Sequence, residues 1–107
     1  MNVQFKKGVL DLILLHLIEE KPRSAYDLII LLSEGLHVNE NTIYPLLRRL
    51  EKEAYLSHKK AYGEMGAPKK IFLLTEKGKE HYLKLYHDWH SFQKEVSILL
   101  GGNKNDT

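Results

Sequence analysis

Apolar side chains recur every three or four positions through most of this chain, the spacing of helices that pack one face against a core. The first such stretch covers residues 7–20 and is apolar around nearly its whole circumference. A domain this small cannot bury all sides of such a helix, so we expect part of it to meet a second chain. Lys21-Pro22 ends the stretch, because the residue before a proline is pushed out of the helical region.

Two further helical stretches follow, with only a few residues between them. Ser24 is predicted to cap the first, with Asp27 placed to complete a capping box and Gly35 placed to end the helix. The second is expected over residues 39–56 with Asn39 as its N-cap. Its apolar positions face a core, namely Ile43, Leu46, Leu47 and Leu50. Two short helices joined by so tight a link predict a helix-turn-helix.

Short strand-compatible runs replace the helical pattern after residue 56. Ser57–Tyr62 and Lys69–Leu74 are predicted to form a β-hairpin around the turn-forming residues 63–68. Thr75 is expected to cap a last helix of about 26 residues that ends at Gly101-Gly102. The predicted fold is therefore mostly α with a small β-hairpin (α+β). It comprises a winged helix-turn-helix over residues 1–74, a dimerisation helix over residues 75–102 and a disordered tail over residues 103–107.

The last helix carries a single apolar seam with alternating spacings of three and four residues. This heptad pattern predicts packing against another helix, in the first place the same helix of a second chain. The expected dimer interface consists of Tyr82, Leu85, Trp89, Phe92, Val96 and Leu99. We therefore expect a homodimer built on this helix, with the first helix contributing.

The length and composition of the chain exclude several kinds of protein and of binding site. The 107 residues favour one domain with a modest core. The absence of cysteine excludes disulfides and cysteine-based metal sites, and it fits a cytoplasmic protein. No apolar stretch is long enough to span a membrane. Asp11 and His16 interrupt the first apolar run, so we do not expect it to be a targeting signal.

Positive charge is concentrated in residues 48–70, where seven Lys or Arg outnumber three Glu although the whole chain carries a net charge of only +2. Such a segment is typical of a nucleic-acid binder, although a solvated helix face and a charged, soluble hairpin would share it. A helix with short polar groups first and arginines one turn later suits a major groove, and a basic hairpin suits the backbone or minor groove. The predicted DNA-binding residues are Asn41, Thr42, Tyr44, Pro45, Arg48, Arg49, Lys52, Lys59, Lys60, Lys69 and Lys70.

Two other classes of function compete with double-stranded DNA binding. For catalysis, His87 and His90 lie one turn apart, but no carboxylate or cysteine set completes a metal site with familiar spacing. Ser24 and Ser33 lack a recognisable nucleophile context. We therefore predict no enzyme, no metal and no cofactor. The other alternative is a winged-helix module for protein–protein contacts, which would show no specific DNA site above background.

The most specific motif of the chain is NTIYPLLRRLEKE at residues 41–53. Other short motifs are Lys7-Gly8 with Leu10, AYDL at residues 25–28, GAPKK at residues 66–70, LTEKG at residues 74–78 and Trp89. In these motifs the sequence resembles the PadR-like family of bacterial transcriptional regulators in its short form with a single C-terminal helix. The chain departs from the family pattern at Ala54, where glycine is usual, and at Ala67 and Lys69, where arginine is usual. It also departs in the second wing strand, where the family's aromatic positions appear as Ile71 and Phe72.

The resemblance implies a homodimeric repressor of a nearby operon, and a dimer with two recognition helices predicts a palindromic operator. In some short members of the family, small aromatic or drug-like effectors enter a hydrophobic space between the subunits. The expected ligand-binding residues are Trp89, with Tyr86 and Phe92 as neighbours. An aromatic at a heptad position is also typical of a packed core, so the sequence leaves both roles open for Trp89.

Overall fold

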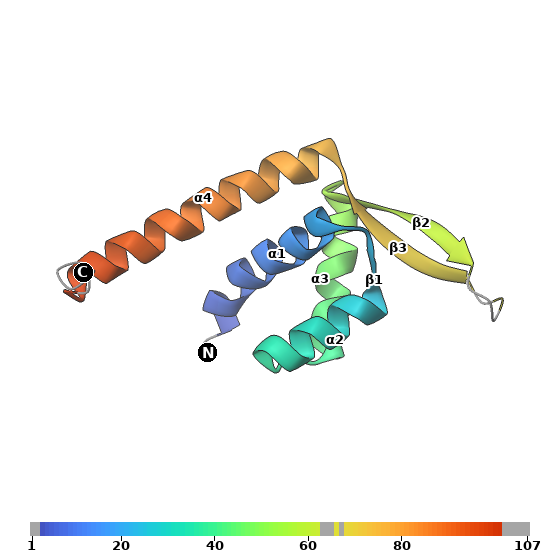
Figure 1. Ribbon diagram of the computed structural model, residues 1–107, viewed down its shortest axis with the longest axis horizontal. Helices are drawn as coiled ribbons and strands as arrows, with labels where there is room; N and C mark the ends of the chain where they lie inside the picture. The colour runs from blue at the N-terminus through green and yellow to red at the C-terminus, as the bar shows by residue number, and fades with distance from the viewer. Residues whose placement is uncertain (1–2, 63–65, 67, 102–107) are drawn as a thin grey trace.

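Three helices pack together and a fourth projects from them (Figure 1). The computed structural model describes residues 3–62, 66 and 68–101. The helices are α1 (Val3–Glu20), α2 (Ala25–Leu36), α3 (Glu40–Lys52) and α4 (Glu76–Leu99). An antiparallel sheet in the order β1-β3-β2 is formed by β1 (Arg23–Ser24), β2 (Leu56–Tyr62) and β3 (Pro68–Leu74). This confirms the predicted winged helix-turn-helix with a long C-terminal helix, and it adds β1, a strand that the pattern did not predict.

All three predicted N-caps are confirmed by a side-chain oxygen that accepts a hydrogen bond at the start of its helix. The pairs are Ser24 Oγ with the Asp27 amide (3.1 Å), Asn39 Oδ1 with the Asn41 amide (2.8 Å) and Thr75 Oγ1 with the Gly78 amide (2.9 Å). These bonds satisfy amides that have no acceptor within the helix itself. α2, α3 and α4 therefore begin where short polar side chains stand in the sequence.

The predicted end of α2 at Gly35 is wrong. The helix runs on to Leu36, and His37 takes the left-handed conformation (φ 57°) that glycine usually supplies. The His37 amide donates to the Ser33 carbonyl (3.0 Å), so backbone hydrogen bonds close the helix without a glycine. α1 also differs from the prediction, since it begins at Val3 rather than at residue 7.

The predicted end of α3 at residue 56 is also wrong, because the helix stops at Lys52 and residue 56 begins β2. Ala54 turns the chain with a left-handed φ of 68°. The Tyr55 carbonyl beyond it accepts from the Thr75 amide (3.1 Å). A Cβ on Gly78 would lie 2.0 Å from that carbonyl oxygen, so glycine is required where α4 passes this turn. The start of α4 is thus fastened to the turn that follows α3.

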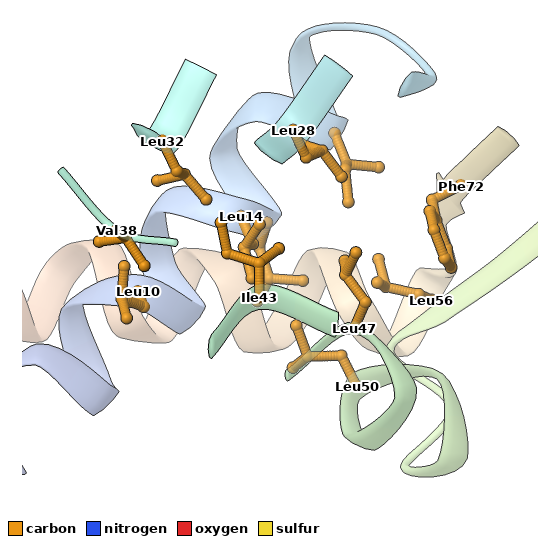
Figure 2. Packing of buried hydrophobic residues seen from close by; sticks show 12 residues of the cluster. Leu10, Leu14, Leu28, Leu32, Val38, Ile43, Leu47, Leu50, Leu56 and Phe72 are labelled. Atoms are coloured by element: carbon orange, nitrogen blue, oxygen red, sulfur yellow. The ribbon is translucent and has the colours of Figure 1, made fainter. Parts of the chain in front are cut away.

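One hydrophobic core joins α1, α2, α3 and the sheet (Figure 2). Its buried members are Leu10, Leu14, Leu15, Ile18, Leu28, Leu32, Val38, Ile43, Leu47, Leu50, Leu56 and Phe72. The core fixes α3 against α1, because Ile43, Leu47 and Leu50 form its buried face. The position of the predicted recognition helix therefore depends on helix packing as well as on its own sequence.

α4 ends at Leu99, close to the predicted end, and Gly101 follows with a left-handed φ of 79°. The predicted tail at residues 103–107 lies outside the described residues, as do residues 63–65 and 67 of the predicted turn. No helix in the described part of the chain is both long enough and apolar enough to cross a membrane.

Candidate functional site

α3 has the two faces that its sequence predicts. Its apolar residues are buried, apart from half-buried Leu46, which also packs against the core. Six predicted DNA-binding residues are exposed on the helix, namely Asn41, Thr42, Tyr44, Pro45, Arg48 and Lys52, and Glu40 in the first turn is exposed as well. Pro45 has no N–H, so it donates no helical hydrogen bond to the Asn41 carbonyl. The exposed face thus offers amide, hydroxyl and guanidinium groups along two turns.

A basic cleft of about 390 Å³ lies between α2, α3 and β3. It is lined by Ser24, Ala25, Tyr26, Tyr44, Leu47, Arg48, Lys69, Lys70 and Phe72. Two tyrosines and three cations therefore border the same opening. Tyr26 is 67% exposed and was not among the predicted site residues. The feature of the sequence that could have identified Tyr26 is an aromatic residue in the first turn of a helix, two residues after the Ser24 cap.

The hairpin of β2 and β3, the wing, carries the four predicted lysines, and all four are exposed. Lys60 pairs directly with Lys70, whereas Lys59 is opposite Ile71 and Lys69 is opposite Ala61. Because successive residues of a strand point to opposite faces, Lys60 and Lys70 share one face while Lys59 and Lys69 share the other. The wing is therefore basic on both sides.

Glu51 of α3 neutralises part of one wing face. Its carboxylate pairs with Lys70 Nζ (2.9 Å) and with Nδ1 of His58, a residue of β2. Burial alone would raise the pKa of Glu51, but the hydrogen bonds from His58 and Lys70 outweigh it and the pKa is lowered from its ordinary value. Lys70 also lies 5.1 Å from the centre of the Phe72 ring. The four wing lysines are thus not equivalent, since Lys70 already has an anionic partner.

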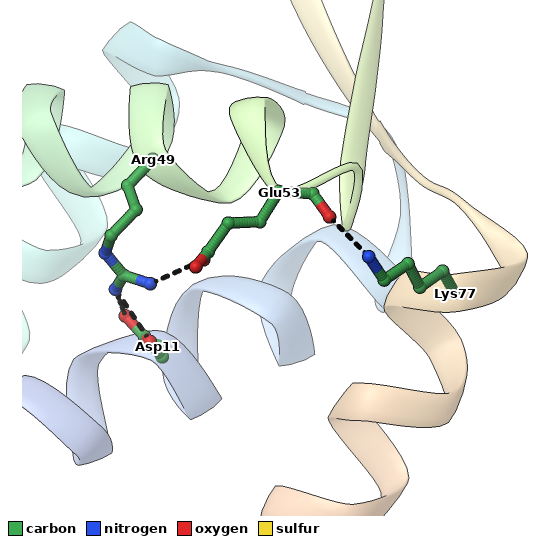
Figure 3. A network of polar contacts seen from close by, with 4 residues as sticks. All are labelled: Asp11, Arg49, Glu53 and Lys77. Carbon is green, nitrogen blue, oxygen red and sulfur yellow. Dashed lines mark hydrogen bonds and ion pairs between the residues drawn. The ribbon is translucent and has the colours of Figure 1, made fainter.

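The two neighbouring arginines of α3 point in different directions. Arg48 is exposed and borders the basic cleft. Arg49 turns towards α1, where its Nη2 contacts both carboxylate oxygens of Asp11 (2.6 and 2.8 Å). Its Nη1 donates to Glu53 (2.8 Å), as Figure 3 shows. The hydrogen bond to Asp11, the largest contribution, raises the pKa of Arg49.

The first part of the α4 seam packs within its own chain. Tyr82 and Leu85 lie against the core, and the Tyr82 hydroxyl is hydrogen-bonded to His16 Nδ1 (2.7 Å). Further along, Val96 is half-buried and Leu99 is 86% exposed. The six residues predicted as a dimer seam therefore have different environments in the single chain.

An apolar cleft of about 240 Å³ lies between α1 and α4. Its lining is Gly8, Val9 and Leu12 from α1 with Leu85, Asp88, Trp89 and Phe92 from α4. The Trp89 and Phe92 rings are 6.5 Å apart between centres and tilted by 41°. Two of the three predicted ligand-binding residues thus line the same apolar cleft.

Tyr86, the third predicted ligand-binding residue, is not in the lining of this cleft. Its ring stacks on His16 (6.4 Å between centres) and contacts His90 (4.5 Å). His87 is exposed, and across the described ranges no three His, Cys, Asp or Glu side chains form a group that could hold a metal ion. Trp89 and Phe92 are therefore the two candidates for ligand contact that the geometry brings together.

The chain is similar to a known protein family and to several solved structures. The model of the transcriptional regulator PadR-like family matches residues 14–84. A transcriptional regulator from Streptococcus is 31% identical with a TM-score of 0.84, covering 92% of this chain and 98% of that chain. A PadR-like transcriptional regulator from Bacillus cereus is 30% identical with a TM-score of 0.82, covering 91% and 96%.

Bacillus subtilis PadR in complex with operator DNA is 28% identical with a TM-score of 0.63, covering 76% of this chain and 46% of that chain. The family match begins within α1 and extends over α2, α3, the wing and the first turns of α4. Proteins of this family are transcriptional regulators, which confirms the prediction that the chain is not an enzyme. The chain belongs to the PadR-like family of transcriptional regulators.

Proposed function

We propose that this regulator represses transcription by binding a palindromic operator as a homodimer, and that a small planar apolar ligand releases it. The observation that carries the DNA assignment is the exposed polar face of α3, which borders a basic cleft and a basic wing. The operator complex of Bacillus subtilis PadR, whose fold is similar, supports the same partner here. Such a regulator acts on chromosomal DNA, which in bacteria lies in the cytoplasm.

The contacts divide by the chemistry of each side chain. Asn41, Thr42 and Arg48 carry groups that hydrogen-bond to base edges in a major groove, and Tyr44 and Pro45 supply apolar contact. Lys52 and the wing residues Lys59, Lys60 and Lys69 suit backbone phosphates, as does the exposed Tyr26 at the basic cleft, whereas Lys70 is ion-paired with Glu51. Arg49 is left out of this set because its guanidinium is bonded to Asp11 and Glu53.

The dimer is proposed on the exposed apolar end of α4. Ile98, Leu99 and Leu100 expose large apolar surfaces in the single chain, and burying them against a second copy gains roughly 25 cal/mol per Å². Leu99 is the last residue of the heptad seam, so the same helix of a second chain is the partner that fits. Two α3 helices related by two-fold symmetry would then contact half-sites about 10 bp apart, or a multiple of that.

The ligand is proposed to occupy the apolar cleft beside Trp89 and Phe92. Its lining is almost wholly apolar, and tilted aromatic rings favour a planar compound that contacts their faces. Asp88 in the lining would favour a compound that also carries a positive charge. A ligand releases DNA only if it prefers the dimer geometry that does not fit the operator.

The direct test is selection of duplexes from a randomised library, followed by titration of the selected duplex at several salt concentrations. A repressor of this kind should enrich a palindrome. With about 6–10 phosphates contacted, its affinity should fall roughly 10³- to 10⁵-fold between about 50 and 200 mM salt. Arg48→Ala and Thr42→Ala should weaken binding to the selected duplex more than to random duplex. A protein–protein module would enrich no sequence, and that result would refute the proposal.

A further inference from the structure

Arg49 of the recognition helix forms an ion pair with Asp11 of α1, the more buried of the two partners (Figure 3). Asp11 and Arg49 are 38 positions apart in the sequence, and two contacts of 2.6 and 2.8 Å join them. The Asp11 side chain is only 14% exposed, so its carboxylate is largely shielded from water. The Arg49 side chain is 34% exposed, but its two charge-assisted contacts to the shielded carboxylate give the pair a better-defined geometry than a loose surface pair has.

The guanidinium of Arg49 is a planar fork whose two amino groups hold different helices. Nη2 holds Asp11 of α1, while Nη1 holds Glu53 at the C-terminal end of its own helix. The Glu53 carbonyl in turn accepts from Lys77 Nζ of α4 (3.0 Å). The network therefore joins α1, α3 and the start of α4, and it lies one residue from Arg48 on the exposed face.

From this geometry we propose that Asp11 and Arg49 are a positioning pair that sets how α3 is rotated on α1, so that Arg48 and Thr42 face the DNA groove. The inference rests on the proposed DNA-binding function. It gives Arg49 a role different from that of Arg48, although the two are adjacent in the sequence. α1 also lines the apolar cleft through Val9 and Leu12, on either side of Asp11, so a ligand that shifts α1 moves this pair as well.

For Asp11→Asn, electrostatic attraction alone and a positioning role predict opposite changes in affinity for DNA. The substitution removes a negative charge and frees a guanidinium, and both changes should strengthen attraction to DNA. If the pair positions α3, the same substitution should instead weaken binding to the operator. The two explanations therefore differ in the sign of the effect.

The experiment is a double-mutant cycle with Asp11→Asn, Arg49→Gln and the double variant, using the duplex that the wild-type protein selects. We expect each single variant to lose about ten-fold in affinity for that duplex, and the double variant to lose no more, because one interaction is removed in all three. Each variant should lose less affinity for random duplex than for the selected duplex, because the orientation of α3 matters for base contacts and not for the sequence-independent phosphate contacts. Glu53→Gln is the matched control, since it removes the anionic partner of Arg49 at the C-cap of α3 rather than the one on α1, and it should change affinity less than about two-fold.

Wild-type or tighter binding by Asp11→Asn would overturn the proposal. So would equal losses by Arg49→Gln on selected and random duplex with a salt slope reduced by about one, which identifies a phosphate contact. If Arg49→Gln proves unfolded by circular dichroism, Arg49→Lys replaces it: a positioning role predicts a similar loss because lysine lacks the fork, whereas a phosphate contact predicts an unchanged slope. Failure of the wild-type protein to select any duplex would refute the proposed function, and the positioning role with it.

Discussion

Among single side chains, Glu51 has the clearest effect on the charge of the DNA-facing surface. Replacing it with glutamine removes the anionic partner of Lys70 and leaves the ammonium group available to a phosphate. We expect Glu51→Gln to bind selected and random duplex several-fold more tightly, with a salt slope steeper by about one. The measurement is duplex titration at several salt concentrations. Adding Lys70→Gln should restore the wild-type slope, and a gain that survives this second substitution would contradict the assignment.

Glu51 also predicts a pH dependence of stability. Its pKa is lowered in the folded chain, so its contribution to stability is present above the unfolded value near 4.5 and is lost as the pH falls through the folded value. The melting temperature of wild type should therefore fall further between about pH 5 and about pH 3 than that of Glu51→Gln. Thermal unfolding followed by circular dichroism checks this, and equal falls in both proteins would count against it.

Ala54 lies in the turn that follows α3, Gly78 of α4 packs against Tyr55 of the same turn, and substitutions at the two positions should have opposite effects. Ala54 has a left-handed φ of 68°, which costs an alanine about 1–2 kcal/mol. Ala54→Gly should stabilise the fold by up to about 1 kcal/mol, since the greater freedom of unfolded glycine offsets part of the gain. Gly78→Ala should destabilise it by about 1–3 kcal/mol, because the new Cβ would lie 2.0 Å from the Tyr55 oxygen. Urea unfolding midpoints measure both, and a stabilised Gly78→Ala protein would show that this contact is not limiting.

At the level of whole elements, α4 combines a packing role with an exposed seam. Leu99 is 86% exposed in the single chain, so Leu99→Glu should leave the fold intact and yet weaken the proposed dimer. A carboxylate there would have to be buried without a partner on association. Sedimentation velocity at micromolar concentration should show a larger monomer fraction. Leu83→Glu is the control, because Leu83 is 63% exposed on the same helix but lies off the seam; equal dissociation by both variants would place the interface elsewhere.

In the molecule as a whole, α1 lines the apolar cleft and also contacts the recognition helix. A planar cationic compound that binds the cleft should quench the emission of Trp89, which is the only tryptophan of the chain. At saturation it should weaken operator binding about ten-fold, which corresponds to a coupling of about 1.4 kcal/mol. The check is a fluorescence titration followed by duplex titration with ligand present. Quenching without any change in DNA affinity would separate ligand binding from regulation.

Much of the local structure follows from short stretches of sequence. Ser24, Asn39 and Thr75 start their helices because a short side chain satisfies an amide only two or three residues away, so neighbouring residues contain all the information needed. The apolar spacing likewise marks the buried face of α3, since a helix repeats every 3.6 residues whatever surrounds it. The helix-turn-helix, the wing and the long last helix could be predicted on these grounds.

Other features depend on contacts between distant segments and could not be predicted in this way. Arg48 and Arg49 are identical and adjacent, yet the packing of α3 on α1 directs only Arg49 towards Asp11. β1 forms because its two residues pair with Phe72 and Ile71 of β3, which are distant in the sequence. Two residues are too few to show a strand pattern of their own. Tyr82 fits the seam pattern, but its hydroxyl is bonded to His16 in its own chain. Sequence periodicity tells which side chains are apolar or charged, whereas their partners depend on which surfaces the fold brings together.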